Sequence, residues 1–209
     1  MIIIILICSL VIGYSLGSIP SGLIITKYMT GEDIRETGSG NIGATNVLRS
    51  GQKRAAILTL LFDMAKAWLA VYLVMCMSEA RVNGQLGEVY PSIPAFIAGI
   101  AALLGHMYPI WLNFKGGKGV ACYFGMILAL SPFVFLIAAS IWLLMFALKR
   151  ISSVAALSTI MFVPGWMFVF TDSIGALFIL LASLLIAWRH KENIMRLYQG
   201  EEKSFGTSQ

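Results

Sequence analysis

Long uncharged stretches of apolar residues alternate with short polar segments along most of the chain. A helix rises about 1.5 Å per residue, so about twenty apolar residues cross a hydrocarbon core that is about 30 Å thick. The stretches that reach or approach this length are Ile2–Ile25, Ala55–Met77, Ile93–Leu112, Val154–Phe170 and Ile174–Trp188. Each of them predicts a transmembrane helix.

One further stretch, Val120–Leu148, is too long for one upright crossing and short for two. Ser131–Pro132 interrupts it near the middle. Because Lys and Arg collect in cytoplasmic loops, their placement decides the number of crossings. A turn at Ser131–Pro132 leaves Arg81 as the only basic residue in an external loop, whereas a single crossing would put Lys149 and Arg150 outside.

We therefore expect an all-α integral membrane protein with seven transmembrane helices, its N-terminus outside and its C-terminus cytoplasmic. Residues 1–200 are expected to form one domain and residues 201–209 a polar tail, which frays from Gly200 on. Composition agrees, since 58% of the residues are hydrophobic and only 12% are charged. These fractions exclude a water-soluble globule, a disordered chain and a nucleic-acid-binding module. The net charge of +5 then reflects cytoplasmic loops.

Three cysteines, Cys8, Cys76 and Cys122, lie within or beside apolar stretches. Their spacing fits neither a disulfide framework nor a metal site. We expect them to be small buried hydrophobic residues.

The first cytoplasmic loop, within Thr26–Arg54, is rich in glycine and small polar residues over Gly38–Asn46, and Arg49 follows. Glycines let successive backbone N–H groups turn inward around an anion, and Arg49 offers a fork that suits phosphate. The sequence alone leaves open a flexible polar loop with a helix cap at Thr45 or Asn46.

A second block, Asn113–Gly119, holds two lysines among three glycines at the start of an apolar helix. The first turn of that helix and Lys118 could bind an anion. The Walker spacing is absent, so nucleotide hydrolysis is not supported. A positive-inside signal made of Lys115 and Lys118 is the alternative, and we expect the nearby His106 to be a helix residue with ordinary partners.

Other polar groups lie close to or within the apolar stretches. On a continuing helix His190 and Asn193 would project to one face. Ser152 and Ser153 are either a helix cap or a substrate contact. Asp63 and Lys66, three residues apart inside a predicted span, are expected to neutralise one another and to face the bundle, because each charge alone would cost about 2.5–3.5 kcal/mol near the bilayer centre. The sequence leaves open whether this pair is structural or positions the first loop.

Three motifs follow one another along the chain. They are Gly-Ser-Ile-Pro-Ser-Gly from Gly17, Gly-Ser-Gly-Asn-Ile-Gly-Ala-Thr-Asn from Gly38, and Gly-His-Met-Tyr-Pro from Gly105 followed by Phe-Lys-Gly-Gly-Lys-Gly-Val-Ala. Together these motifs resemble those of the bacterial acyl-phosphate-dependent glycerol-3-phosphate acyltransferases. The resemblance implies transfer of a fatty acyl group from acyl phosphate to the 1-hydroxyl of sn-glycerol 3-phosphate. The products are lysophosphatidic acid and phosphate. It also implies the first step of phospholipid biosynthesis at the bacterial inner membrane, with membrane lipid around the protein, no cofactor, no metal and no obligate protein partner.

The same resemblance assigns residues to the two substrates. Those implied to bind glycerol 3-phosphate are Ser39, Arg49, Lys118, Ser153, His190 and Asn193. Those implied to bind acyl phosphate are Gly40, Asn41, Gly43, Ala44, Thr45 and Asn46. Catalytic roles fall on Ser39, Lys118, His190 and Asn193. Where the family usually has threonine after Gly-Val-Ala, this chain has Cys122.

The residues suggest two mechanisms and three classes of protein. No nucleophile motif is present, and acyl phosphate has a good leaving group, so positioning and charge stabilisation suffice. The proton of the glycerol hydroxyl goes either to a substrate phosphate or to His190. A small transporter for a phosphorylated metabolite is the rival function, although transport sites usually lie near the midplane rather than at the inner boundary. A membrane scaffold would leave the glycine and lysine blocks unexplained.

Overall fold

The computed structural model describes residues 2–79 and 93–205, and this part of the chain is entirely helical, with no strand. The expected all-α class is confirmed. The predicted external loop Ser78–Ser92, with Arg81, lies almost wholly outside the described residues. The α-helices are α1 (Ile2–Gly17), α2 (Ser21–Thr30), α3 (Ala44–Arg49), α4 (Lys53–Glu79), α5 (Ile93–Met107), α6 (Val120–Leu130), α7 (Pro132–Lys149), α8 (Ser152–Phe170), α9 (Ser173–Arg189) and α10 (Lys191–Gln199), and the 3₁₀ turns are η1 (Ile34–Glu36) and η2 (Ile110–Leu112).

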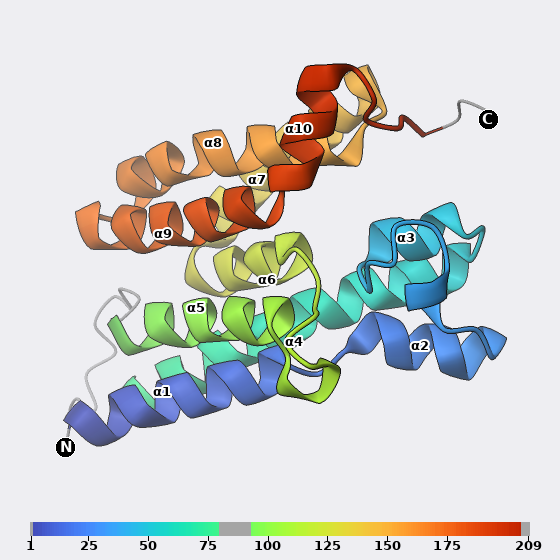
Figure 1. The fold of residues 1–209 in the computed structure, drawn as a ribbon. Helices are drawn as coiled ribbons and strands as arrows, with labels where there is room; N and C mark the ends of the chain where they lie inside the picture. Colours follow the sequence, from blue (N-terminus) through green and yellow to red (C-terminus); the bar gives the residue numbers. More distant parts are fainter. Residues whose placement is uncertain (1, 80–92, 206–209) are drawn as a thin grey trace. The chain divides into compact units, whose positions relative to one another are not determined.

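The chain divides into two compact units, and the first ends at Leu130. In it α5 contacts α1, α4 and α6, and α4 also contacts α1, α2, α3 and α6 (Figure 1). Small residues lie where these helices meet, such as Ala98 and Ala102, whose exposed fractions are 0%. Gly17 lies directly against the backbone of Ala102. The first glycine motif therefore serves close helix contact in this structure.

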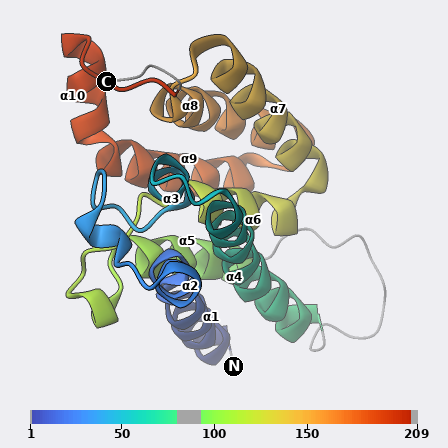
Figure 2. The ribbon, with the colours of Figure 1, turned by 90° about the vertical axis from the view of Figure 1, so that its right-hand side faces the viewer.

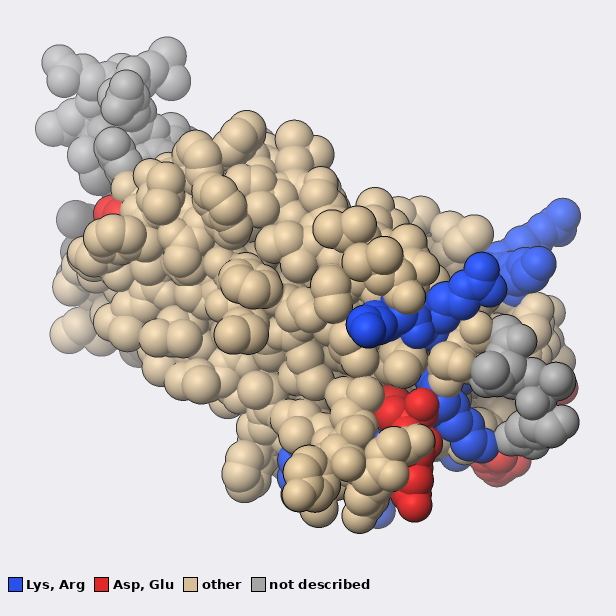
Figure 3. All heavy atoms as spheres, turned by 90° about the horizontal axis from the view of Figure 1, so that it is seen from above, with Lys and Arg blue, Asp and Glu red and all other residues tan. Residues whose placement is uncertain are grey.

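The second unit, Ser131 onward, contains α7, α8 and α9 as consecutive neighbours, followed by the short α10 (Figure 2). Many of its apolar side chains are exposed, including Leu143, Leu144, Phe168 and Val169 at 60–65%. Exposed apolar surface of this extent suits contact with lipid chains. On the face that Figure 3 presents, Lys and Arg gather toward one end beside a broad uncharged surface.

The described residues contain five helical spans long and apolar enough to cross a membrane, or six if the bent pair α9 and α10 counts as one. The helix α6 has only 11 residues. The predicted turn within Val120–Leu148 is present, because α6 ends at Leu130 and α7 begins at Pro132. Ser131 caps α7, its Oγ accepting from the N–H of Val134 at 3.4 Å. The number of crossings and the orientation stay predictions.

The first predicted span, Ile2–Ile25, lies within one candidate membrane span, Ile2–Thr30. Its helix is interrupted between α1 and α2, because Pro20 has no N–H to continue the helical ladder. Two local expectations are wrong. The helix after Trp188 does not continue straight, since α10 is bent by 60° from α9 at His190. The tail does not fray at Gly200, since the Phe205 N–H donates to the Arg150 carbonyl at 2.7 Å and the Phe205 ring packs edge-on against Phe146.

The cysteines are free thiols, and they differ in environment. Cys122 is buried as expected, Cys8 is partly buried, and Cys76 is exposed on α4. The expectation of burial is therefore wrong for Cys76, because its segment of α4 faces outward from the first unit.

Candidate active site

The glycine-rich loop lies between η1 and α3, and the Asn46 side chain holds it together. Its Oδ1 accepts from the N–H and the Oγ of Ser39 at 2.9 and 3.2 Å, and its Nδ2 donates to the carbonyls of Ile34 and Thr37. Gly38 and Gly40 adopt φ of 59° and 68°, a region that favours glycine. The loop is thus a fixed turn rather than a flexible polar segment.

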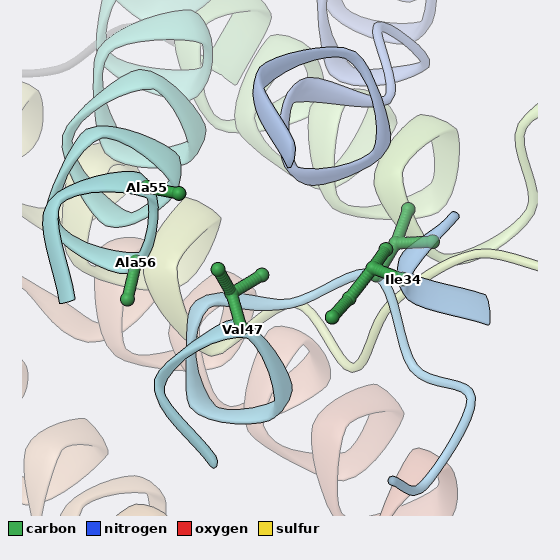
Figure 4. Close-up of a cluster of buried hydrophobic side chains, with 5 residues drawn as sticks. Ile34, Val47, Ala55 and Ala56 are labelled. Carbon is green, nitrogen blue, oxygen red and sulfur yellow. The ribbon is translucent and has the colours of Figure 1, made fainter. Parts of the chain in front are cut away.

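An apolar cluster anchors both ends of this loop to the start of α4. It consists of Ile34, Ile42, Val47, Ala55 and Ala56, all at most 5% exposed. In Figure 4 the labelled members Ile34, from η1, and Val47, from α3, flank one another while Ala55 and Ala56 approach from α4. Leu112 of η2 also contacts this cluster, so the glycine loop and the lysine-bearing segment share one support.

The structure separates the roles of the loop residues that were predicted to bind acyl phosphate. The N-cap of α3 is Gly43 without a side-chain bond, so the alternative of a cap at Thr45 or Asn46 is wrong. Asn46 is a buried brace, and Asn41 Oδ1 accepts from the Gly43 N–H at 3.0 Å. The N–H groups of Ala44 and Thr45 lie in the first turn of α3, where a helix has no carbonyl of its own for them.

Ser39 and Gly40 are exposed, and Arg49 lies exposed in the last turn of α3. Next to them is an ion pair that sequence reasoning missed, between Asp33 and Arg35. Hydrogen bonds from the Arg35 side chain and backbone lower the pKa of Asp33 to about 2. An Asp directly before a short helical turn is a recognisable cap signal, and here Asp33 caps the start of η1, which precedes the loop.

The lysine block forms a second turn between α5 and α6. The N–H groups of Gly116 and Gly117 donate to the carbonyls of Met107 and His106 at 3.1 and 3.0 Å, which folds the segment back onto the end of α5. Lys118, partly buried, follows directly. Two glycines of the block are therefore bonded to the end of α5, which a positive-inside signal alone would not require.

The η2 turn in this segment is also tied to the first helix. The Tyr14 hydroxyl donates to the Tyr108 carbonyl at 2.9 Å, and the Trp111 indole N–H donates to Ser18 Oγ at 2.9 Å. Sequence reasoning missed both bonds, since they join residues about ninety positions apart.

The expected pairing of Asp63 and Lys66 is confirmed, with Lys66 Nζ 2.7 Å from Asp63 Oδ1 and both side chains buried. His106 joins them, its Nδ1 lying 3.1 Å from Lys66 Nζ. The helix histidine thus has partners, as predicted, although they are charged. Asp63, His106 and Cys122 bring ligand-type atoms within 4.8 Å of one another. The Lys66 ammonium already supplies the cation that this carboxylate meets.

In the second unit two predicted substrate residues converge on a carboxylate that sequence reasoning did not single out. Glu202 Oε1 accepts from Ser153 Oγ at 2.7 Å and from Asn193 Nδ2, and Oε2 accepts from Arg196 Nε at 2.6 Å. Its side chain is 4% exposed. Burial alone would raise the pKa of Glu202, but these three hydrogen bonds outweigh it and hold the pKa below its usual value.

The structure also distinguishes the two serines before α8. Ser153 is buried and bonded to Glu202, while Ser152 is only partly buried. Neither caps the helix, because the N-cap is Ile151, so the cap interpretation is wrong. The one available signal for Glu202 was an acidic side chain in a tail expected to fray.

His190 is buried at the bend between α9 and α10, one turn from Asn193. Its Nδ1 lies 2.8 Å from the Ile186 carbonyl. A carbonyl can only accept, so Nδ1 carries a proton and Nε2 is the basic nitrogen of the neutral ring. The hydrogen bond to Ile186 therefore fixes the tautomer of the neutral ring.

The predicted site residues thus fall into two groups. Ser39, Arg49, Lys118 and the glycine loop belong to the first unit, and Ser153, His190 and Asn193 to the second.

Comparison with known proteins covers both groups. The family model described as Glycerol-3-phosphate acyltransferase matches residues 7–200. The chain is 48% identical over 203 residues to a protein of that description from Methylorubrum populi, covering 96% of this chain and 93% of that one. It is 43% identical over 197 residues to one from Methylobacillus flagellatus, covering 92% and 93%.

Two solved structures are also similar to this fold. One is the integral membrane glycerol 3-phosphate acyltransferase PlsY in its glycerol 3-phosphate form, with a TM-score of 0.86, 35% identity and coverage of 97% of this chain and 96% of that one. The other is the same enzyme in a lysophosphatidic acid form, with a TM-score of 0.85 and 33% identity.

Proposed function

This chain belongs to the glycerol-3-phosphate acyltransferase family, and from that premise we propose that its acyl donor is an acyl phosphate. The reaction moves the fatty acyl group to the 1-hydroxyl of sn-glycerol 3-phosphate and gives lysophosphatidic acid and phosphate. The hydroxyl oxygen bonds to the acyl carbon, the bond from that carbon to the bridging phosphate oxygen breaks, and the hydroxyl proton leaves with phosphate. The reaction balances without a cofactor.

Family membership carries this function, and it favours acyl transfer over the rival transporter. The protein is a multi-pass membrane protein. We place it in the bacterial inner membrane with seven crossings, its N-terminus outside and its C-terminus cytoplasmic. In that orientation the glycine loop, the lysine block and α10 all lie at the cytoplasmic side, where glycerol 3-phosphate is dissolved.

We assign glycerol 3-phosphate to Ser39, Arg49, Lys118, Ser153, His190 and Asn193. The cationic side chains of Arg49 and Lys118 suit a phosphate dianion. Asn193 and Ser153 carry the polar atoms for the glycerol hydroxyls, and Glu202 sets their direction.

We assign the acyl phosphate headgroup to the loop Gly40–Asn46. In this assignment the N–H groups of the first turn of α3 face the phosphate, and Asn46 supports the loop from behind as a buried brace. The acyl chain then lies along the apolar helices, in the lipid. A rigid loop lowers the cost of ordering the donor for attack.

The proton of the attacking hydroxyl has two candidate acceptors, a substrate phosphate and Nε2 of His190. We favour the phosphate, because the acyl carbon is already activated by its leaving group and needs charge stabilisation more than a strong base. Ser39, Lys118, His190 and Asn193 remain the residues closest to the reacting atoms in this assignment.

The test uses purified full-length protein supplied with palmitoyl phosphate and glycerol 3-phosphate. We expect release of phosphate in equal amount with lysophosphatidic acid. Palmitoyl-CoA in place of the acyl phosphate should give no product. Uptake of glycerol 3-phosphate into liposomes without product would contradict the function.

The acceptor is tested separately with His190→Gln. We expect this variant to retain measurable turnover, because the proton leaves with a substrate phosphate. Loss of all turnover with intact glycerol 3-phosphate binding would identify His190 as the base instead.

A further inference from the structure

Three ionisable side chains form a buried cluster that the proposed substrate contacts do not include. Asp63 and Lys66 come from α4 and His106 from α5, and their side chains are 2%, 6% and 4% exposed. Lys66 Nζ lies 2.7 Å from Asp63 Oδ1 and 3.1 Å from His106 Nδ1, and Nδ1 lies 3.4 Å from the same carboxylate oxygen. Ionisable groups at this depth of an apolar bundle point to function.

The ammonium of Lys66 joins the cluster to the break between α1 and α2. It donates to the Ile19 carbonyl at 2.7 Å. This break is also where the Trp111 indole of η2 is bonded, through Ser18 Oγ. Lys66 from α4 and Trp111 from the α5–α6 connection therefore hold the same short stretch of chain.

The imidazole of His106 joins the cluster to the lysine block. Its edge at Nδ1 faces Lys66 and Asp63, and the rest of the ring lies against Gly117. A Cβ at Gly117 would collide with Nε2 and would come within 2.8 Å of Cε1 and 3.0 Å of Cδ2. The N–H of Gly117 also donates to the His106 carbonyl. The His106 ring therefore packs directly against the backbone of Gly117.

We propose that Asp63, Lys66 and His106 are positioning residues for glycerol 3-phosphate. The ion pair fixes the orientation of the His106 ring, the ring fixes the backbone of Gly117, and Gly117 sets the direction in which the next residue, Lys118, leaves the turn. The inference rests on the proposed assignment of Lys118 to glycerol 3-phosphate. It gives the buried charges a purpose that an ion pair within one helix, on its own, would not have.

The first test removes both charges while keeping size and hydrogen-bonding capacity, in the double variant Asp63→Asn with Lys66→Gln. Binding of glycerol 3-phosphate is measured by calorimetry on the full-length protein in lipid nanodiscs, and KM is measured for both substrates. We expect binding weaker by roughly tenfold, since a misdirected Lys118 loses part of its charge-assisted hydrogen bonding to the phosphate. The KM for palmitoyl phosphate should stay within about twofold.

Thr59→Val is the matched control. Thr59 is buried on α4 one turn before Asp63, and within residues 2–79 and 93–205 its Oγ1 has no hydrogen-bond partner. Valine keeps the shape, so this variant should bind both substrates as the unmodified protein does. Equal losses for both substrates in the charge-free variant, or altered thermal stability with unchanged affinity, would make the cluster merely structural.

A second test changes side-chain volume rather than charge, and it does not require the first variant to fold. Gly117→Ala forces its new methyl group into the His106 ring, and His106→Ala removes that ring. If the ring positions Gly117, each single variant weakens glycerol 3-phosphate binding and the double variant is no weaker than His106→Ala alone. Additive losses would contradict the contact on which the inference depends.

Lys118→Gln separates failure of the inference from failure of the proposed site. If this variant binds glycerol 3-phosphate normally, the assignment of Lys118 is wrong and the inference falls with it. If Lys118→Gln weakens binding and the charge-free variant does not, the site stands and the inference is wrong.

Discussion

At the scale of single residues, the most informative distinction is between neighbours that look equivalent in the sequence. Ser152 and Ser153 are adjacent hydroxyls after a basic pair, and no pattern separates them. In the structure the second is buried with its Oγ on a carboxylate, and the first is not. Asn46 also differs from its prediction. We predicted that it touches substrate, but its side chain makes four hydrogen bonds to Ser39, Ile34 and Thr37 of the protein itself.

Ser153→Ala should therefore raise the KM for glycerol 3-phosphate, whereas Ser152→Ala should not. The first variant removes a hydroxyl that we assign to the charged substrate, and a hydrogen bond to a charged group is typically worth about 1.5–3 kcal/mol, or roughly ten- to a hundredfold. Initial rates with saturating palmitoyl phosphate would measure it. A larger effect from Ser152→Ala would reverse the assignment.

At the scale of elements, two residues of the tail hold the described end of the chain in place. The Glu202 carboxylate accepts hydrogen bonds from Ser153 at the start of α8 and from Arg196 on α10. Phe205 contacts Arg150 through its backbone N–H and Phe146 through its ring. Hydrophobic patterning could not reveal this, because the tail carries no apolar period and its bonds join Ser153 to a position 49 residues away.

Glu202→Gln should lower the melting temperature at neutral pH, and the difference from the unmodified protein should shrink in acid. The folded state lowers the pKa of Glu202. Its stabilising contribution is therefore complete above the ordinary glutamate pKa of about 4.5 and is lost as the pH falls through the lower, folded value.

Melting curves in detergent between about pH 7 and pH 2 would follow this change, because the loss is complete only below the folded pKa. Glu201→Gln, which alters the exposed neighbour, is the control. A difference between Glu202→Gln and the unmodified protein that stayed constant over this range would show that the carboxylate charge is not what holds the tail.

Elements whose signal is local in the sequence could be predicted, and elements that depend on tertiary contacts could not. The break at Ser131–Pro132 was predictable, because a proline after a capping serine is a local signal. The bend at His190 was not, since helical spacing continues through it and tertiary contact decides its direction. The Asp63–Lys66 pair followed from spacing, whereas its link to His106 and Gly117 needed the three-dimensional arrangement of α4 and α5.

At the scale of the whole molecule, the prediction that remains is the path through the membrane. In a variant whose three cysteines are replaced by alanine, Ser173→Cys should react with an impermeant maleimide in intact cells. Arg150→Cys and Lys203→Cys should react only after the membrane is permeabilised. Labelling of Arg150→Cys from outside would mean that α6 and α7 together cross once.

The shortness of α6 has a consequence for the surrounding lipid. Eleven residues of helix rise about 16 Å, roughly half of a hydrocarbon core of about 30 Å. The turn at Ser131 is polar, and it can reach water only where the bilayer is locally thin. If α6 crosses by itself, as the seven-helix topology predicts, the lipid beside it is deformed. Bilayer thickness then becomes a property that acts on this enzyme from outside its own chain.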